Sequence, residues 1–182
     1  MTTFHHLGDD LVYQGHVWKV VVGRFRAPDG SEFTRDIVRS PGAVAVVAVD
    51  AEGRVVLLRQ YRAAFARSIV EIPAGMRDID GEDPLETARR ELVEEAGVTA
   101  ETWILLHRFL PSTGMTDATL DVFLATDLTD VERATHGPEE DHMEVFRLPM
   151  DEALRLVETG EIADAKSTIG LLLAERRLRR RG

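Results

Sequence analysis

Cysteine is absent from the 182-residue sequence, so disulfide bonds, thiolate nucleophiles and cysteine-based zinc sites are excluded. Long hydrophobic runs are absent too, since none approaches the roughly 20 apolar residues that a helix needs to cross a bilayer. The first six residues, Met-Thr-Thr-Phe-His-His, lack the basic and apolar regions of a secretory signal. From these absences we expect a cytoplasmic protein with no membrane partner.

Basic residues are few relative to acidic ones. The sequence has 22 lysines and arginines against 32 aspartates and glutamates, which gives a formal charge of −10. Nucleic-acid backbones need positive surfaces, so we expect no nucleic-acid partner, and we interpret the arginines of residues 176–181 as cations at a helix C-terminus. An acidic enzyme for anionic substrates must use local cations, namely metal ions and a few placed arginines.

Apolar residues make up 44% of the sequence, and their spacing alternates between strand-like and helix-like patterns. The length suits one domain with an appended piece, so we predict an N-terminal β extension over residues 1–40 and an α/β domain over 41–182. Residues 4–6 are expected to be a disordered terminus. Strands are predicted at residues 17–26, 33–38, 43–49, 54–60, 68–72, 102–109, 119–126 and 143–148, and helices at 84–96, 151–158 and 164–179.

The predicted helix over 84–96 has clear boundaries and one acidic face. Asp83 can cap its start and Gly97 is a stop signal. Glu91, Glu94 and Glu95 are three and four residues apart, so their carboxylates project from nearly one face. Like charges at this spacing repel unless a cation lies between them, and Mg²⁺ binds carboxylate oxygens together with substrate phosphates. An ordinary solvated helix face is the alternative interpretation.

The segment from Gly75 to Val98 resembles the Nudix box, whose pattern is Gly, five residues, Glu, seven residues, then Arg-Glu-apolar-x-Glu-Glu-x-Gly-apolar. Glu82, Arg90-Glu91 and the later fixed positions match this pattern. One departure is that six residues, not five, separate Gly75 from Glu82. The extra residue falls in the loop before the helix, where insertions are tolerated, and leaves the spacing of the carboxylates unchanged. The resemblance implies the Nudix fold, an α/β/α sandwich with a mixed sheet, and Mg²⁺-dependent hydrolysis of a diphosphate, in which Mn²⁺ can substitute.

The resemblance also implies roles for individual residues. Arg90 would orient the glutamates, while Gly75, Glu82 and Gly97 would shape the box. The general base is expected from the acidic stretch 138–144. The metal ligands implied are the Ala74 carbonyl, Glu91, Glu94 and Glu95. The catalytic residues implied are Arg90 and Glu94, together with the general base. The candidate bases are Glu139 and Glu140, followed by Asp141 and Glu144.

The order of elements further resembles the ADP-ribose pyrophosphatase branch of this family. The turn Gly160-Glu-Ile-Ala-Asp-Ala-Lys-Ser167 matches the branch, as does Gln60-Tyr-Arg62, whose arginine is implied to touch substrate phosphate. A solvated charge at a strand end is the alternative for Arg62. Products would be AMP and ribose 5-phosphate. A pyrophosphatase for another sugar nucleotide, such as GDP-mannose, and a non-catalytic ADP-ribose sensor are the competing hypotheses.

The stretch 111–117 occupies the place of a loop that lies near the terminal ribose in this branch, which makes Gly114 and Met115 candidate substrate-binding residues. Two positions depart from the branch: Thr113 stands where proline is expected, and Ala118 occupies or adjoins an acidic position, for which Asp117 is a possible substitute.

The N-terminal strands are expected to form a homodimer, because such strands cross to a second subunit in this branch. An aromatic residue there can stack on the adenine, and Trp18, followed by Phe25, is the candidate. Packing in a hydrophobic core is the alternative for such an aromatic.

Overall fold

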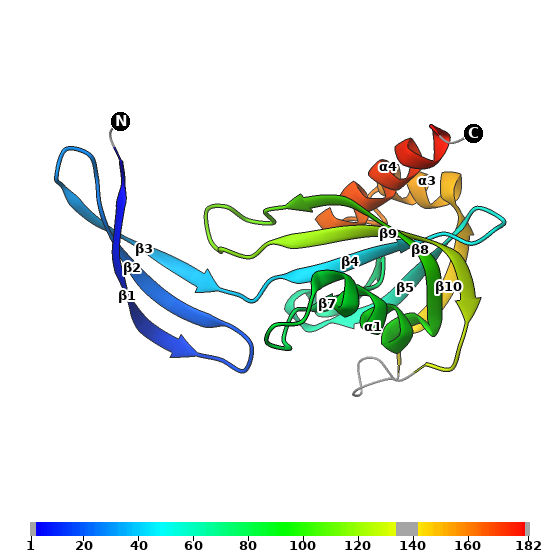
Figure 1. Ribbon diagram of the computed structural model, residues 1–182, viewed down its shortest axis with the longest axis horizontal. Coiled ribbons are helices and arrows are strands. Elements are labelled where there is room, and N and C mark those ends of the chain that lie inside the picture. The colour runs from blue at the N-terminus through cyan, green and yellow to red at the C-terminus, as the bar shows by residue number, and fades with distance from the viewer. Residues whose placement is uncertain (1–2, 134–141, 181–182) are drawn as a thin grey trace. The chain divides into compact units, whose positions relative to one another are not determined.

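The computed structural model in Figure 1 describes residues 3–133 and 142–180. Its contacts divide the chain into two compact units, which are described separately. The N-terminal unit comprises residues 1–42 and 110–119, and the larger unit comprises residues 43–109 and 120–182. The N-terminal unit thus takes in a second stretch of chain, 110–119, far along the sequence.

The N-terminal unit is built on a three-stranded antiparallel sheet in the order β1-β2-β3, with β1 His5–Gln14, β2 Lys19–Arg26 and β3 Glu32–Arg39. Phe25 and Phe33 stack at a ring-centroid distance of 5.4 Å, and the His6 ring stacks on Phe25. The expectation that residues 4–6 are disordered is wrong for His5 and His6. Pairing with β2 orders them, which a sequence pattern read locally does not reveal.

The larger unit contains two sheets, in the orders β7-β4-β9-β8 and β10-β5-β6. Strands β4 and β9 are parallel and all other pairs are antiparallel, so the sheet structure is mixed, as predicted. The strands are β4 Ala43–Ala48, β5 Arg54–Arg62, β6 Arg67–Glu71, β7 Ala74–Met76, β8 Val98–Phe109, β9 Leu120–Asp130 and β10 Glu144–Pro149.

Among the described residues, helices α1 Pro84–Ala96, α3 Met150–Thr159 and α4 Ala165–Arg179 cover the strands, and a short 3₁₀ helix, η1 Ala63–Phe65, follows β5. Strand β4 is buried on both faces, so alternate side chains serve different helices. Val46 packs in one cluster with Leu92 of α1, and Val47 packs in another with Leu171 of α4. Each fully buried leucine contributes about 1.5–3 kcal/mol. The predicted α/β/α sandwich is therefore confirmed.

The predicted elements lie within the usual boundary error of about four residues of those observed. Two strands, β1 and β7, were not predicted. Strand β7 is only three residues long, too short for a hydrophobic pattern, and pairs with β4. Of the helices in the described ranges, none has the length and apolar character needed to span a membrane.

Candidate metal and phosphate site

Helix α1 holds the three glutamates, and its ends are defined by short-range chemistry. The Asp83 side chain accepts a hydrogen bond of 2.9 Å from the Leu85 N–H, and proline occupies the first turn. Gly97 ends the helix with φ 65°, a left-handed conformation that glycine adopts without strain. Leu92 is fully buried and anchors the helix on the sheet. The neighbouring face, which carries the glutamates, is thereby fixed toward β7.

Arg90 organises the acidic face. Its Nη1 lies 2.8 Å from Glu91 Oε1 and 2.9 Å from Glu94 Oε2, while its Nη2 lies 3.2 Å from Glu82 Oε2. Thr87 Oγ1 donates a further hydrogen bond to Glu82. The hydrogen bond from Arg90 lowers the pKa of Glu82, and Thr87 adds to this effect. Glu82 therefore secures Arg90, which in turn orients the two glutamates next to it.

Glu91 is a buried carboxylate whose surroundings oppose its ionisation. The residue is 9% exposed, and burial raises its pKa to about 7, although the Arg90 charge opposes the rise; the neighbouring Glu94 charge adds to it. A Cβ on Gly75 would lie 1.8 Å from Glu91 Cδ, so the carboxylate occupies the space that a side chain would fill. The absence of a side chain at Gly75 thus creates the seat for Glu91.

Glu95 reaches the same strand. It is 6% exposed, and its Oε2 accepts a hydrogen bond of 2.8 Å from the Ala74 N–H. Glu91 and Glu95 therefore both end at β7, against its first two residues, Ala74 and Gly75.

The donor set fits a hard divalent cation. It consists of the carboxylate oxygens of Glu91, Glu94 and Glu95, with the Ala74 carbonyl that the resemblance implies, and Mg²⁺ prefers ligands of this type. A bound cation would offset the burial and the Glu94 charge that raise the Glu91 pKa. In the described part of the chain, no three acidic or imidazole groups are already converged as a metal cage. Arg90 lies between Glu91 and Glu94 and supplies the positive charge there.

Arg62 lies at the end of β5 in the larger unit. Its Nε and Nη2 donate to the two oxygens of Glu71 on β6, at 2.8 and 2.9 Å, and its side chain is 39% exposed. Sequence reasoning identified Arg62 but missed Glu71, because a single acidic residue in a strand carries no pattern. Lys166 also contacts Glu71, and the only signal for it was its place in the matched turn 160–167.

Gly114 and Met115 belong to the N-terminal unit. They line a cavity of about 460 Å³ whose other lining residues include three phenylalanines, Phe4, Phe25 and Phe33. Met115 is 55% exposed, and its carbonyl accepts a hydrogen bond of 2.9 Å from the Val38 N–H. The aromatic candidate Phe25 therefore lies at the same cavity as both loop residues.

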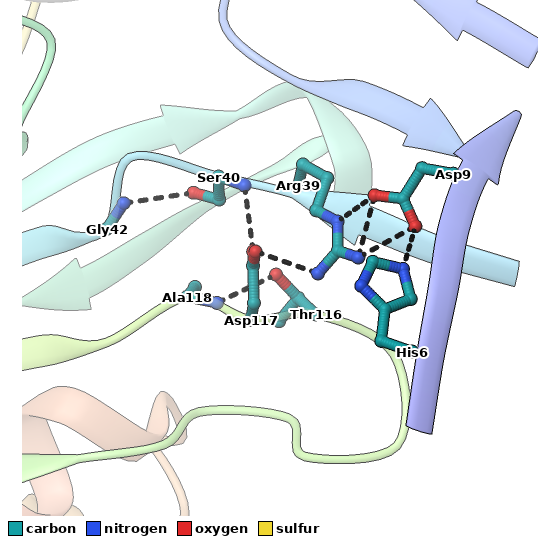
Figure 2. A network of polar contacts seen from close by, with 8 residues as sticks. All are labelled: His6, Asp9, Arg39, Ser40, Gly42, Thr116, Asp117 and Ala118. Carbon is teal, nitrogen blue, oxygen red and sulfur yellow. Dashed lines mark hydrogen bonds and ion pairs between the residues drawn. The ribbon is translucent and has the colours of Figure 1, made fainter. Parts of the chain in front are cut away.

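Asp117 holds this loop rather than offering a free carboxylate. Figure 2 shows Arg39 between Asp9 of β1 and Asp117, with the Arg39 Nη1 3.1 Å from Asp117 Oδ2. The other Asp117 oxygen accepts a hydrogen bond from the Ser40 N–H. Both oxygens of Asp117 are thus engaged within the unit, and its role as a substitute for the acidic residue near position 118 stays a prediction.

The remaining candidates from the sequence are Trp18, Glu144 and the acidic residues that precede Glu144. Trp18 is 55% exposed in the turn between β1 and β2, so it does not pack in a core. Glu144 begins β10 and pairs with Arg59. Glu139, Glu140 and Asp141 lie outside the described residues.

The chain is similar to known proteins in both sequence and fold. The NUDIX domain family matches residues 39–169. An ADP-ribose pyrophosphatase of Bacillus subtilis (strain 168) is 38% identical over 165 residues, which cover 91% of this chain and 89% of that protein. A methanol dehydrogenase activator of Bacillus methanolicus is 39% identical over 162 residues, covering 89% and 87%. A crystal structure described as an ADP compounds hydrolase superposes with a TM-score of 0.84 over 98% of this chain and 96% of its own, at 22% identity, and so shares the fold.

Proposed function

The chain belongs to the NUDIX family, and from this premise we propose that it hydrolyses the diphosphate bond of ADP-ribose or a related nucleoside-diphosphate sugar. With ADP-ribose the products would be AMP and ribose 5-phosphate. The observation that carries the proposal is the seat of Glu91 and Glu95 against β7, where Arg90 orients the acidic face. The similarity to an ADP-ribose pyrophosphatase over most of both chains supports the choice of substrate class.

The roles of the residues follow from their places. Glu91, Glu94, Glu95 and the Ala74 carbonyl would hold Mg²⁺, or Mn²⁺ in its place. When bound, the cation supplies charge neutralisation on phosphate oxygens and lowers the pKa of a water molecule. Arg90 keeps the carboxylates in position through its hydrogen bonds.

The proton acceptor and two substrate contacts are assigned to residues outside the acidic face of α1. The general base remains assigned to the acidic stretch that contains Glu139 and Glu140, which the described residues do not include. Arg62 would donate to substrate phosphate, since a guanidinium suits that role. Trp18 would offer an exposed ring for stacking on the base.

We also propose that the protein is a homodimer formed through its N-terminal strands. Leu11, Val12 and Tyr13 of β1 are each at least 60% exposed, and a three-stranded sheet of this size has little core of its own. Large apolar side chains left exposed on one short strand would be buried by a second chain packed against it. A second copy of the chain is the occupant that the sequence resemblance implies. A cytoplasmic location agrees with a nucleotide substrate and stays a prediction.

A second candidate is hydrolysis of another sugar nucleotide, such as GDP-mannose. It is favoured by the departures at Thr113 and Ala118 and by the engagement of Asp117 with Arg39 and Ser40. These residues belong to the loop that carries Gly114 and Met115, so they bear on which sugar is accepted and leave the metal chemistry unchanged.

The test compares Mg²⁺-dependent kcat/KM for ADP-ribose, GDP-mannose, UDP-glucose and NADH, each with a chelator control. A preference for ADP-ribose of more than about tenfold, or ~1.4 kcal/mol of discrimination, would support the first candidate. A preference for another sugar nucleotide would support the second. Tight ADP-ribose binding without any metal-dependent product would refute both and indicate a sensor.

A further inference from the structure

Glu71 is a buried carboxylate that lies between two cations. It ends strand β6 with its side chain 3% exposed, and its two oxygens accept the paired hydrogen bonds from Arg62. Lys166, the second residue of α4, contacts Glu71 Oε2 from the other side. A buried carboxylate is stable only when it is paired and hydrogen-bonded, and this one meets both conditions.

The geometry leaves Arg62 oriented but available. A paired contact through Nε and Nη2 fixes the plane of the guanidinium group, because both donors are engaged by one carboxylate. The Nη1 donors lie away from that edge, and within the described residues they make no hydrogen bond. The side chain remains 39% exposed. An anion can therefore approach a guanidinium whose direction is already set.

Lys166 is itself held in place. Its Nζ lies 2.9 Å from Asp164 Oδ1, and Asp164 caps α4 by accepting from the Ser167 N–H. Ser167, fully buried, accepts a hydrogen bond of 2.9 Å at Oγ from the Ile72 N–H, one residue beyond Glu71. The Asp164 carboxylate thus holds the lysine at the end of β6, while the Ser167 hydrogen bond separately joins α4 to the residue after that strand.

The ionised state of a buried Glu71 explains why two cations contact it. Burial opposes ionisation of Glu71, but the hydrogen bond from Arg62 and the charge of Lys166 lower its pKa. With Lys166 in place, Glu71 stays ionised and can hold both donors on one edge of Arg62. The guanidinium is itself always charged, so its opposite edge can meet a phosphate.

We propose that Glu71 and Lys166 are positioning residues that orient the Arg62 guanidinium toward the diphosphate of the substrate. The proposal rests on the proposed function. It assigns a purpose to the 160–167 turn, whose lysine reaches a carboxylate 95 residues earlier in the chain.

A purely structural role is the competing explanation, since the same contacts join α4 to β6. The two roles differ in what they change. A positioning role alters substrate affinity through Arg62, whereas a structural role alters the free energy of unfolding and leaves KM unchanged. Ser167→Ala is the matched control, because it removes the Ile72 hydrogen bond at the same junction without touching Arg62 or Glu71.

The experiment measures kcat and KM for the best nucleoside-diphosphate sugar, and ADP affinity by calorimetry, for wild type, Arg62→Ala, Glu71→Gln, the double variant and Ser167→Ala. Glu71→Gln should raise KM and weaken ADP binding by about tenfold or more, as expected when a charged hydrogen bond is lost. Glu71→Asp should recover part of the affinity. The double variant should bind no worse than Arg62→Ala, because both changes remove one contact.

Additive losses in the double variant, or an equal rise in KM for Ser167→Ala, would overturn the proposal. If Glu71→Gln does not fold, Lys166→Met replaces it: raised KM at unchanged kcat supports positioning, and unchanged KM contradicts it. Wild-type protein with no turnover on any sugar nucleotide would refute the proposed function instead. The ADP titration would still decide whether Glu71 orients Arg62.

Discussion

The substitution Gly75→Ala tests the position of the Glu91 carboxylate without otherwise changing the fold. The new Cβ would lie 1.8 Å from Glu91 Cδ and 2.2 Å from each carboxylate oxygen. To reach an ordinary contact the carboxyl carbon must move by about 1.6 Å, and a displacement of about 1 Å in a catalytic site can cost on the order of 10²-fold in rate. We therefore expect kcat/KM to fall by about 100-fold or more.

The same substitution should hardly change stability. The clash involves the end of a flexible side chain, and an off-rotamer Glu91 costs about 0.5–1.5 kcal/mol. Replacing glycine by alanine in a compatible strand conformation returns about 0.4–1 kcal/mol by restricting the unfolded chain. The two effects nearly cancel, so the melting temperature should shift by no more than about 2–4 °C.

The assay pairs Mg²⁺-dependent kinetics with thermal unfolding and adds a double-mutant cycle with Glu91→Ala. Once the Glu91 carboxylate is gone, the Gly75→Ala change should cause no further loss of activity. Near-normal turnover in Gly75→Ala would refute the reasoning, since it would mean that Glu91 can leave its seat without consequence. A large loss of stability would also refute it, because the damage would then be to the fold.

Three other substitutions probe the metal site, the buried ion pair and the start of α1. Glu95→Gln should lower activity by at least about 100-fold, the upper figure for losing an outer-shell partner, with an unchanged circular dichroism spectrum; wild-type turnover would exclude Glu95 as a ligand. The pKa of Glu71 is lowered in the folded state, so ionised Glu71 stabilises the fold fully above pH 4.5, the ordinary glutamate pKa. This stabilisation is lost as the pH falls through the pKa that Glu71 has in the folded state. Urea titrations from about pH 3 to 7 should accordingly show a weaker acid dependence for Glu71→Gln than for wild type, and parallel curves would contradict this. Asp83→Ala should cost about 1 kcal/mol by removing the helix cap. Thermal melts test this, and an unchanged melting temperature would show that the cap contributes nothing.

Local chemistry explains which elements could be predicted from sequence. Helix α1 was predicted with its ends because Asp83 and Gly97 act within one turn of the residues they cap. Strand β4 was predicted because burial on both faces leaves a continuous apolar run. Strand β1 was missed because its side chains are mostly exposed and its apolar residues do not alternate with polar ones. Its order depends on β2 and on the Arg39–Asp9 pair, 30 residues apart.

In the candidate site too, some arrangements could be predicted from sequence and others could not. Glu91, Glu94, Glu95 and Arg90 lie within six residues, so their common face follows from helix periodicity. The engagement of Glu71 by Lys166 could not be predicted, because it depends on how α4 meets β6. The close approach of Glu91 to Gly75 likewise appears only when β7 lies beside α1.

The inclusion of residues 110–119 in the N-terminal unit has a consequence for the order of folding. The three N-terminal strands can pair through short hairpins, but Ser40 and Asp117 are 77 residues apart. Closing so long a loop is slow and entropically costly until the intervening chain is organised. A fragment that ends at residue 42 would lack the segment that Arg39 binds. We therefore expect the N-terminal unit to complete its folding only after the β8–β9 hairpin has formed.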